Sequence, residues 1–418
     1  MPKKIYILFA SFFISCIIFF TALSTSNKSE KDVKTTQISL KDLVSNAAPN
    51  DTITLNGGYY PESGIEIYKP LTIIGKNDPV IDGQSKGKNI FLIKNDSVSL
   101  AGLTIKNVAR HALWDNAAIR IDNSHQCKVL NCKFENAYFG IYLAKSSNCE
   151  VIGNKFQSQG SHESDAGNGI HLWKSGHIHI KDNVIKGHRD GIYLEFGKAC
   201  MIENNWSENN IRYGLHFMFS DSCKYLNNHF EHNGAGVAVM YTHDIEMINN
   251  TFANNWGTAA YGLLLKDIHD SKIYGNQFVN NTVGIHSEGS IRIKVEHNNF
   301  IRNGWGARIF ANSNDNFFGS NNFISNTFDI ASNSRMNFNK FIGNYWSGYS
   351  GYDINLDGWG DVPYRPVRLF SLLASQQEPV MLLLHSIFIE FLDIAERIFP
   401  VLTPETLIDS KPSMKIIK

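Results

Sequence analysis

Two stretches that lie one repeat apart decide the fold of this chain. They are Gly214-Leu215-His216-Phe217-Met218-Phe219 and Gly236-Val237-Ala238-Val239-Met240-Tyr241. In each stretch a glycine is followed by apolar residues at its first and third positions. The same pattern recurs, with some slack, at Gly140, Gly169, Gly191, Gly214, Gly236, Gly262, Gly284 and Gly306, with separations of 29, 22, 23, 22, 26, 22 and 22 residues.

The repeat predicts a solenoid of β-coils. A period of about 22 residues, with short alternating strands separated by asparagine and glycine, is too short for a helix pair and is typical of one coil of a parallel β-helix. Asparagine accepts the left-handed turn conformation, which explains its abundance between the strands. The two long separations predict loops at about 158–167 and 256–261, and such loops often border a binding site.

Strand alternation assigns the faces of each coil. Positions one and three after each glycine are apolar and should point inward, whereas positions two and four should point outward. Met218 and Met240 therefore occupy the same outward position on neighbouring rungs. His216 precedes Met218 by two residues and should lie on the same outer face.

Length, charge and the first residues bound the class of protein. The chain has 418 residues, and its 39 basic and 39 acidic residues cancel, which gives no electrostatic reason to expect a nucleic-acid partner. Lys3 and Lys4 precede an apolar run, which predicts an export signal over 1–24 and a polar linker over 25–37. The alternative is an uncleaved membrane anchor, because the run approaches the length of a bilayer span.

Five cysteines follow the signal. Cys127, Cys149 and Cys223 occupy a repeat position that holds isoleucine in other coils, and Cys200 lies within one residue of it. The exchange of cysteine with isoleucine indicates core filling rather than metal or redox chemistry. Cys132 falls outside this register, and the odd number of cysteines argues against a disulfide framework.

The β-helix is predicted over 38–350, with a short capping helix near 40–46 because an open coil end exposes unpaired backbone groups. Residues 351–365 form an acidic, glycine-rich closing loop. Its oxygen-bearing residues alternate around Gly358 as in a calcium loop, although Tyr364 stands where a bidentate glutamate is expected. The candidate calcium ligands are Asp353, Asn355, Asp357 and Asp361. The alternative is a hydrogen-bonded turn that closes the solenoid.

Residues 366–418 are predicted to be a helical extension that ends in an extended tail. The segment from Val380 to Phe399 is apolar almost all round, and its charges argue against a transmembrane span. A helix of this kind needs a partner surface, so it either packs on the end of the solenoid or docks to another protein near the membrane. The residues predicted to dock are Leu382, Leu383, Ile387, Phe388, Phe391 and Leu392.

Soft ligands gather near the two opening stretches. The candidate metal ligands are His216, Met218, Met240, His243 and Met247. Thioether and imidazole groups prefer Cu(I) among extracellular metals. The alternative is that the outward methionines pack beneath a loop or a partner. His171 and His286, which share the position of His216, are expected to be surface residues.

A carbohydrate-active β-helix is the competing interpretation and rests on fold analogy alone. A lyase, hydrolase or epimerase needs clustered carboxylates on one exposed strip. Glu195 and Glu288 share one outward position but are four rungs apart, roughly 19 Å at about 4.8 Å per rung. This separation is too large for a carboxylate pair.

Several segments resemble the NosD family over essentially all of the mature chain. They are Arg212-Tyr213-Gly214-Leu215-His216-Phe217-Met218-Phe219-Ser220, Asn233-Gly234-Ala235-Gly236-Val237-Ala238-Val239-Met240-Tyr241, Asn344-Tyr345-Trp346-Ser347, Gly360-Asp361-Val362-Pro363-Tyr364-Arg365-Pro366-Val367-Arg368 and Leu402-Thr403-Pro404-Glu405-Thr406-Leu407. The first two segments carry His216, Met218 and Met240 at matching positions.

The resemblance implies a periplasmic, right-handed β-helix that is not an enzyme. It implies docking on the membrane and ATPase subunits of an ABC transporter, receipt of Cu(I) from a copper-chaperone lipoprotein, and maturation of the copper centres of nitrous oxide reductase. The apolar segment from Val380 to Phe399 would then contact the transporter. The preferred prediction is a copper-handling assembly subunit, and the alternative is a carbohydrate-binding or polysaccharide-modifying β-helix.

Overall fold

The computed structural model describes residues 39–111, 114–160, 162–334, 338–376, 378–384, 386–399 and 407–418. The chain divides into two compact units, Met1–Ile38 and Ser39–Lys418. The predicted signal peptide over 1–24 and linker over 25–37 lie outside the described residues. All the elements below belong to the second unit.

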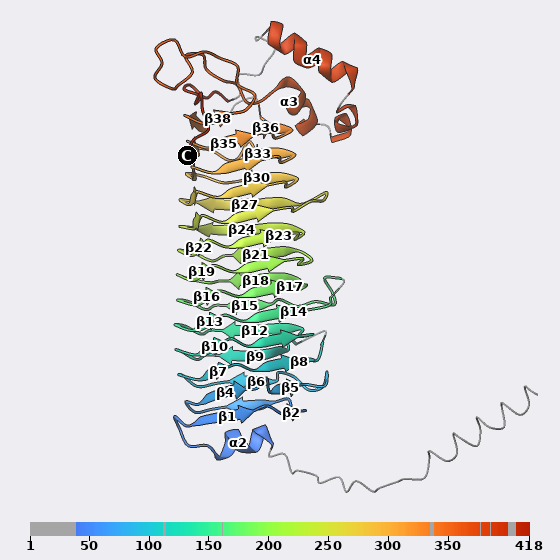
Figure 1. Cartoon of the computed structure of the whole chain (residues 1–418), viewed down its shortest axis with the longest axis vertical. Helices are drawn as coiled ribbons and strands as arrows, with labels where there is room; N and C mark the ends of the chain where they lie inside the picture. The colour runs from blue at the N-terminus through green and yellow to red at the C-terminus, as the bar shows by residue number, and fades with distance from the viewer. Residues whose placement is uncertain are drawn as a thin grey trace, which may run out of the picture. The chain divides into compact units, whose positions relative to one another are not determined.

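The second unit is a right-handed parallel β-helix, which confirms the predicted fold class. Every coil contributes one strand to each of three parallel sheets, so that each strand pairs with the strands three before and three after it (Figure 1). Within the described residues two of the sheets have 13 strands and the third has 12.

The strands of sheet A are β1 (Thr52–Asn56), β4 (Thr72–Lys76), β7 (Ser99–Ala101), β10 (Lys128–Leu130), β13 (Glu150–Ile152), β16 (His179–Lys181), β19 (Met201–Glu203), β22 (Lys224–Leu226), β25 (Glu246–Ile248), β28 (Lys272–Tyr274), β31 (Lys294–Glu296), β34 (Phe317–Gly319) and β37 (Lys340–Ile342). The strands of sheet B are β2 (Tyr59–Tyr60), β5 (Val80–Asp82), β8 (Thr104–Lys106), β11 (Lys133–Glu135), β14 (Lys155–Gln157), β17 (Val184–Lys186), β20 (Trp206–Glu208), β23 (His229–Glu231), β26 (Thr251–Ala253), β29 (Gln277–Val279), β32 (Asn299–Ile301), β35 (Asn322–Ile324) and β38 (Tyr345–Trp346).

The strands of sheet C are β3 (Ile65–Ile67), β6 (Phe91–Ile93), β9 (Ala117–Asp122), β12 (Phe139–Ala144), β15 (Ile170–Trp173), β18 (Asp190–Glu195), β21 (Tyr213–Met218), β24 (Ala235–His243), β27 (Tyr261–His269), β30 (Val283–Glu288), β33 (Trp305–Ile309) and β36 (Phe328–Ser332). The two predicted loops separate β14 from β15 and β26 from β27, at the corner between sheets B and C.

The core consists of inward side chains that stack from coil to coil. In sheet C, Leu215 pairs with Val237 and Phe217 pairs with Val239, and all four side chains are fully buried. In sheet B, phenylalanines on neighbouring strands stack with ring centroids between 4.5 and 5.7 Å apart. The predicted inward positions are therefore confirmed.

A buried asparagine ladder joins the coils at the corner between sheets A and B. Its members are Asn154, Asn183, Asn205, Asn228, Asn250, Asn276, Asn298, Asn321 and Asn344. The backbone N–H of each asparagine donates to the Oδ1 of the next, as from Asn205 to Asn228 at 2.9 Å. Most of the side-chain amides do the same, so backbone groups at this buried corner find partners without water.

The ladder has a different residue at each end. At its start the N–H of Cys132 donates to Asn154 Oδ1 at 2.9 Å, so Cys132, which the sequence repeat leaves unassigned, takes the first ladder position. At its end Asp409, from the C-terminal tail, accepts bonds from the N–H of Gly343 and from the N–H and Nδ2 of Asn344. Trp346 Nε1 donates to the same carboxylate at 3.0 Å.

The other cysteines fill the core, as predicted. Cys127, Cys149, Cys200 and Cys223 are buried in the main hydrophobic cluster, and all are free thiols. Cys149 and Cys223 each lie one rung above another cysteine, and a hydrogen bond runs from the N–H of Cys200 to Cys223 Sγ at 3.4 Å.

A short helix, α2 (Leu40–Asn46), covers the first coil and confirms the predicted cap. Leu40 and Val44 pack into the core. Glu62 accepts hydrogen bonds from the N–H groups of Leu40 and Lys41 at 2.7 and 3.1 Å, which satisfies two of the free donors at the helix start. The lower end of the solenoid is thereby closed.

The C-terminal extension contains α3 (Leu369–Gln376), a 3-10 helix η1 (Glu378–Leu383) and α4 (Ile387–Ile398). The prediction of one helix from Val380 to Phe399 is therefore wrong. Ser386 has extended φ and ψ angles of −81° and 153°, the conformation of a residue that starts a new helix. Within the described residues no helix is long and apolar enough to cross a membrane.

Part of the predicted extended tail lies outside the described residues, which resume at Leu407. Asp409 and Ser413 form parallel bridges with Phe341 and Tyr345 of the last coil. These bridges place the tail against the upper end of the solenoid.

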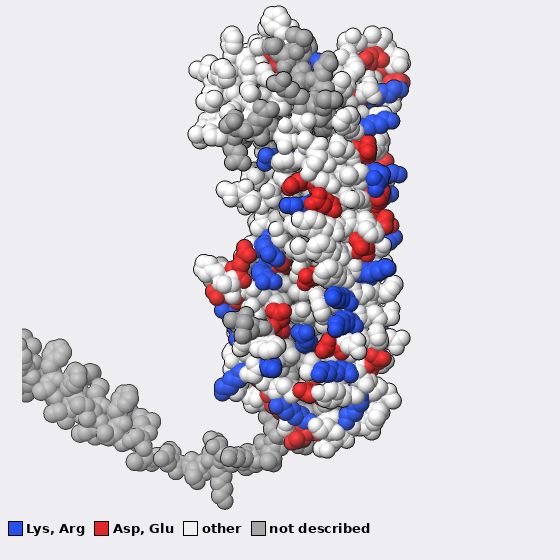
Figure 2. All heavy atoms as spheres, turned by 180° about the vertical axis from the view of Figure 1, so that it is seen from behind, with Lys and Arg blue, Asp and Glu red and all other residues white. Residues whose placement is uncertain are grey.

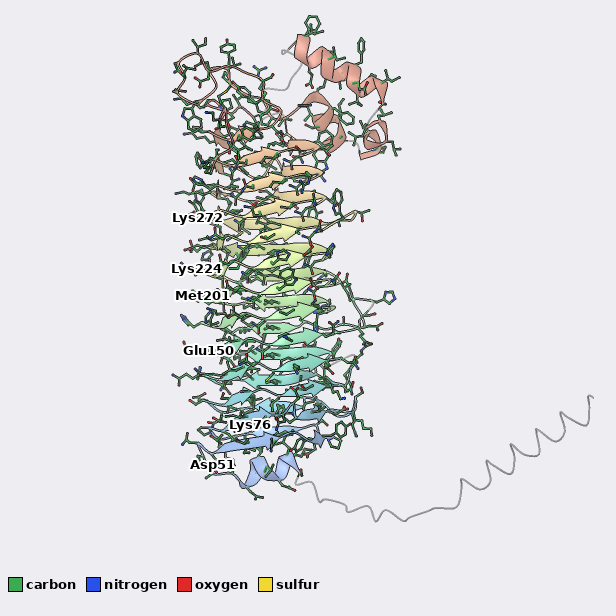
Figure 3. The ribbon with its side chains drawn as sticks, in the orientation of Figure 1. Asp51, Lys76, Glu150, Met201, Lys224 and Lys272 are labelled. Carbon is green, nitrogen blue, oxygen red and sulfur yellow. The ribbon has the colours of Figure 1, made fainter. Side chains whose placement is uncertain are left out.

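Charged side chains of both signs are mixed on the surface. On the face shown in Figure 2 lysine and arginine alternate with aspartate and glutamate over the length of the solenoid. Glu150, Met201, Lys224 and Lys272 project from sheet A along one edge (Figure 3), and Lys224 Nζ lies 2.8 Å from Glu246. Such exposed pairs each contribute little to stability.

The asparagine ladder gives a testable prediction for stability. Replacing Asn154 by alanine leaves the N–H of Cys132 and the carbonyl of Val129 without their partners. We expect the free energy of unfolding to fall by about 3 kcal/mol, because each buried unpaired group costs about 1–3 kcal/mol. Denaturant unfolding of Asn154→Ala and of the neighbouring exposed control Lys155→Ala measures this. Equal stability of the two variants would contradict the role of the ladder.

Candidate functional site

The outer face of sheet C carries the candidate ligands. Tyr193 pairs with His216 and His216 with Ala238 along one register, and Glu195 pairs with Met218 and Met218 with Met240 along the next outward register. The predicted placement of Met218 and Met240 on neighbouring rungs is thus observed. Both methionines are partly exposed, at the edge where sheet C turns toward sheet A.

The register of His216 is buried even though it points away from the core. Tyr142, His171, Tyr193 and His216 are outside the main core cluster but are each 9% exposed or less, because their rings cover one another from rung to rung. His171 and His286 are therefore not surface residues, contrary to the prediction. Burial lowers the pKa of His171 to about 3 and that of His286 to about 4.

His216 sits in a cage of aromatic rings. The ring of Tyr193 stacks below it with centroids 4.7 Å apart, and the ring of Tyr213 lies 4.8 Å away. Neither ring nitrogen of His216 has a hydrogen-bond partner within 3.5 Å. A buried imidazole without partners is costly, and this cost would be relieved by a bound metal ion.

Asp190 lies beside His216 and is fully buried. Its Oδ2 is 3.6 Å from His216 Nδ1, and it accepts two hydrogen bonds from Arg212 at 2.9 and 2.6 Å. Burial by itself would raise the pKa of Asp190, but the nearby imidazole of His216, the hydrogen bonds from Arg212 and the guanidinium charge lower it below its usual value. Asp190 is therefore an ionised, well-anchored partner for one edge of the imidazole.

Met218 has one polar contact. Tyr193 Oη donates a hydrogen bond to Met218 Sδ at 3.5 Å, and burial raises the pKa of Tyr193 to about 12, so this hydroxyl remains a donor. Phe196, Phe219 and Tyr241 follow the outward register at the corner, where they stack with centroids 5.2 Å apart. The methionine pair is therefore bordered by aromatic rings.

His243 is separated from the methionine pair by a corner. The chain turns at Tyr241, which has a φ of 55°, and His243 lies beyond this turn. Its Nε2 is 3.4 Å from Asp221 Oδ2 and its Nδ1 is 2.8 Å from Asp244 Oδ2. The hydrogen bond that His243 donates to Asp244 and the nearby negative charges raise the pKa of His243. The structure thus pairs His243 with carboxylates.

Met247 is not available as a ligand on the outer face, which corrects the prediction. Its side chain is fully buried in the main core cluster, where Met247 pairs in register with Tyr225 and Ile273. Met247 is seven residues after the outward Met240 and two after the inward Ile245, so strand alternation itself places it on the inner face. Of the five predicted metal ligands, His216, Met218 and Met240 share one face.

The closing loop is held by its own acidic side chains. Asp353 accepts bonds from the N–H groups of Asp357 and Gly358, and Asp361 accepts one from Ile354 at 2.7 Å. Asn355 Nδ2 donates to Asp357 at 3.2 Å. These contacts fit the interpretation as a hydrogen-bonded turn, and calcium binding stays a prediction. In the described part of the chain no group of three or more His, Cys, Asp or Glu side chains could hold a metal ion.

The C-terminal helices lie on the outer face of sheet C, above the candidate ligands (Figure 1). Phe370 and Ala374 of α3 and Ile389 of α4 pack against Trp305 and Phe328 of the last rungs. Leu392 also packs against this cluster, so the prediction that it is free to dock a partner is wrong.

The remaining residues predicted to dock face away from the solenoid. Leu382, Ile387 and Phe391 are 88, 84 and 73% exposed, and Leu383 and Phe388 are also exposed. Ile394, Ile398 and Phe399 extend the same apolar surface beyond the predicted set. An apolar surface of this extent is typical of an interaction site.

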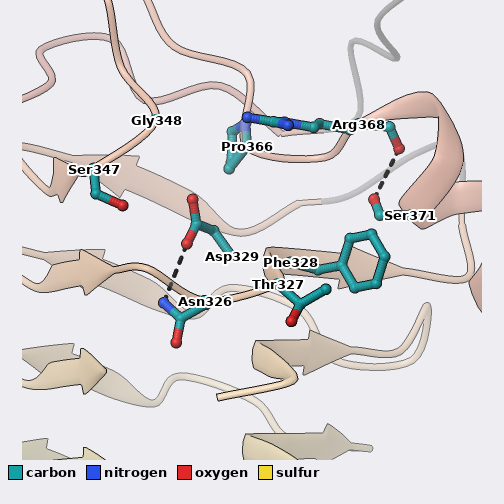
Figure 4. Close-up of a pocket in the computed structure, with 9 residues that line it drawn as sticks. All are labelled: Asn326, Thr327, Phe328, Asp329, Ser347, Gly348, Pro366, Arg368 and Ser371. Atoms are coloured by element: carbon teal, nitrogen blue, oxygen red, sulfur yellow. Dashed lines mark hydrogen bonds between the residues drawn. The ribbon is translucent and has the colours of Figure 1, made fainter. Parts of the chain in front are cut away.

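A polar cavity of about 160 Å³ lies where the C-terminal extension leaves the solenoid (Figure 4). Asp329 of β36 and Arg368, just before α3, line it together with Ser347 and Ser371. Asn326 Nδ2 donates to Asp329 at 3.1 Å, and burial raises the pKa of Asp329 to about 6. The cavity therefore lies between the last coil and the C-terminal helices, and the ionisable side chains of Asp329 and Arg368 line it.

The fold and these side chains define a class: a right-handed β-helix with thioether and imidazole side chains on one outer face and an exposed apolar extension at one end. Residues 153–351 match the family model of the periplasmic copper-binding protein NosD, and residues 50–184 match that of the right-handed β-helix region. This chain is therefore similar to the NosD family.

Two relatives cover most of the chain. A protein from Stutzerimonas stutzeri described as a probable ABC transporter binding protein NosD is 28% identical over 381 residues, 86% of each chain. Its namesake from Pseudomonas aeruginosa is 28% identical over 369 residues, which cover 84% of this chain and 85% of the relative.

Solved structures with a similar fold share little sequence. PfbA, a surface adhesin of Streptococcus pneumoniae, superposes with a TM-score of 0.58 at 14% identity, over 78% of this chain and 93% of that one. The periplasmic alginate epimerase AlgG superposes with a TM-score of 0.51 at 14% identity, over 72% of this chain and 81% of that one. These likenesses concern the fold alone.

Sequence reasoning did not single out Asp190, Tyr193 or Arg212 as neighbours of the ligands. Tyr193 occupies the same outward register as His216 one rung below, and Asp190 begins that strand. The repeat register would have been enough to find both residues, had the rung below been searched for partners.

The cavity gives a prediction for pH dependence. The pKa of Asp329 is about 6 in the folded protein against 3.8 for an unperturbed carboxyl, so the folded state favours the protonated form. This contribution to stability is fully present below about pH 3.8 and is lost as the pH rises through 6. The melting temperature of Asp329→Asn relative to wild type should therefore be higher at about pH 7.5 than at about pH 4.5.

The control is Asp315→Asn, which changes an exposed carboxyl at a turn of sheet A. It should give the same difference from wild type at both pH values. A pH-independent effect of Asp329→Asn would show that this carboxyl is not held in the protonated form.

Proposed function

We propose that this protein is a periplasmic accessory subunit that binds Cu(I) as cargo on the outer face of sheet C and works with an ABC transporter. The observation that carries the proposal is the pairing of Met218 with Met240 beside His216, whose buried ring nitrogens have no hydrogen-bond partner within 3.5 Å, in a chain similar to the NosD family. Two thioethers and an imidazole form a donor set that suits Cu(I).

The donor set fits Cu(I) better than a hard cation. Thioether sulfur binds without losing a proton, and neutral imidazole is a good ligand for copper. Asp190 faces His216 Nδ1, so the Nε2 lone pair is the one left for an ion. A carboxylate held by Arg212 at this distance would orient the imidazole rather than bind the ion itself.

The docking surface supports a role with a membrane partner. The relatives are described as ABC transporter binding proteins, and the exposed face of α4 offers the apolar contact that such binding needs. Trp305, which anchors the helices, is three rungs above Met240, roughly 14 Å along the solenoid at about 4.8 Å per rung. It also lies five residues earlier in register, roughly 17 Å across the sheet at about 3.3 Å per residue. A transporter membrane subunit docked on α4 would therefore meet the same face of the solenoid as the copper site.

In this proposal Cu(I) arrives from a copper-chaperone lipoprotein and leaves for the copper centres of nitrous oxide reductase, with ATP hydrolysis in the transporter driving the exchange. The partly exposed methionine pair suits a site that must release its ion, because exposed thioethers can be exchanged directly with ligands of a partner. The protein itself carries out no covalent reaction.

The carbohydrate-active alternative has less support. Glu195 and Glu288 are four rungs apart through Met218, Met240 and Lys266, as the strand pairing shows. A pair of catalytic carboxylates must lie within about 10 Å. Asp190, which begins the strand that carries Glu195, is buried and paired with Arg212.

The copper site is tested by the double variant Met218→Ala/Met240→Ala. We expect its Cu(I) dissociation constant to rise at least about tenfold, because two of the three donors are removed. Competition of the purified protein with a chromophoric Cu(I) chelator measures this constant. Met201→Ala, which removes an exposed methionine from sheet A, is the matched control. An unchanged constant in the double variant would exclude this site.

The docking surface is tested by Phe388→Glu/Phe391→Glu. Both side chains are exposed, so the solenoid should fold as before while two charges disrupt the apolar contact. We expect the variant to lose co-purification with a co-expressed transporter membrane subunit. Trp256→Glu, at an exposed aromatic in the loop between β26 and β27, should retain it. Co-purification of the double variant at the wild-type level would refute docking through α4.

A further inference from the structure

Within the described residues, the side chain of Tyr193 contacts the side chains of two of the three proposed ligands. Its ring stacks on His216 with centroids 4.7 Å apart and an angle of 29° between the planes. Its hydroxyl donates to Met218 Sδ at 3.5 Å. Both contacts follow from the pairing of neighbouring strands. Tyr193 lies one rung below His216 and pairs with it, and Glu195, two residues after Tyr193, pairs with Met218.

The hydrogen bond restricts a flexible side chain. Methionine has three rotatable bonds beyond its Cα, and its thioether is a weak acceptor, so a partly exposed methionine samples several rotamers. A donor fixed on the neighbouring rung selects the rotamers that bring Met218 Sδ to that hydroxyl. Because sulfur has two lone pairs, one remains free for an ion while the other accepts the bond.

The ring stack restricts the imidazole. With Tyr193 below, Tyr213 on one side and Asp190 at Nδ1, His216 cannot turn without breaking several contacts. On the rung above, the same register holds Ala238, whose methyl group does not fill the space that a larger side chain would take. The imidazole is thus fixed from below and by its flank, on the same rung as Met218.

The same register contains a natural comparison. Tyr142 stacks on His171 with centroids 4.4 Å apart, just as Tyr193 stacks on His216. The outward neighbours on those two rungs, however, are Ala144 and Trp173, so no methionine is within this second pair. The tyrosine–histidine stack therefore belongs to the architecture of the face, whereas the hydroxyl–thioether bond is particular to the rung of Met218.

We propose that Tyr193 is a positioning residue of the copper site, which holds Met218 by its hydroxyl and His216 by its ring so that both donors are set before the ion arrives. This inference rests on the proposed copper-binding function and deepens it. Pre-organisation of this kind increases affinity by lowering the entropy lost on binding. It requires no covalent step.

The decisive variant is Tyr193→Phe, which removes the hydroxyl and keeps the ring stack. We expect the Cu(I) dissociation constant, measured with the same chromophoric chelator, to rise by roughly three- to tenfold, the effect of freeing one methionine side chain. Tyr142→Phe is the matched control, since it removes a hydroxyl from the same register two rungs below, and should leave the constant unchanged.

A second measurement does not require copper. In protein labelled with ¹³C at the methionine methyl groups, Tyr193→Phe should shift the Met218 resonance and increase its mobility in the copper-free protein, while the Met201 resonance stays in place. A merely structural role of Tyr193 in the stack predicts no change specific to Met218, because the ring is retained.

The outcomes separate this inference from the proposed function. If Met218→Ala/Met240→Ala weakens Cu(I) binding but Tyr193→Phe matches Tyr142→Phe in affinity and in the Met218 methyl signal, the positioning role is wrong and the copper site stands. If the methionine double variant binds Cu(I) like wild type, the site itself is wrong, and the positioning role falls with it. Weaker binding and a mobile Met218 in Tyr193→Phe alone support both.

Discussion

The whole structure depends on the in-register hydrogen bonding of one coil to the next. In parallel pairing, equivalent residues of successive coils lie about 4.8 Å apart along the solenoid axis. Their side chains therefore form continuous rows. The buried asparagine ladder satisfies the backbone at the corner between sheets A and B and keeps the coils from slipping against one another. The same register places Met218 against Met240 on the outer face. The stacked core, the asparagine ladder and the methionine pair therefore all result from the same stacking of one coil on the next.

The candidate ligands lie where the rows of outward side chains on sheet C change in residue type. Ala238 breaks the row of aromatic and imidazole side chains above His216, and Met218 and Met240 replace the charged residues that precede and follow them in their register. The docking helices cover the same face a few rungs further on. The proposed site for a soft ion and the apolar surface proposed to meet a membrane partner therefore share one face of the solenoid.

Much of this arrangement could be predicted from the sequence, because a repeat carries its own register. The spacing of the repeat predicted the coil period, the inward residues and the pairing of Met218 with Met240. The need to cover the first coil predicted α2. The inclusion of Met247 among the ligands was wrong because it rested on closeness in sequence, although alternation places this residue inward. The burial of His171 was missed because it depends on rings from neighbouring rungs. The break at Ser386 and the contact of Leu392 with the solenoid depend on tertiary packing that no local pattern encodes.

The carboxylate of Asp409 completes the asparagine ladder from a residue about 65 positions beyond the last asparagine. Because a chain is synthesised from its amino end, its coils can stack as they appear, each on the one before. The uppermost coil, however, keeps an unsealed edge until the tail has been synthesised and has folded back. Completion of the chain is thereby coupled to closure of the end that bears the C-terminal helices, which would keep an unfinished chain from presenting a finished apolar surface.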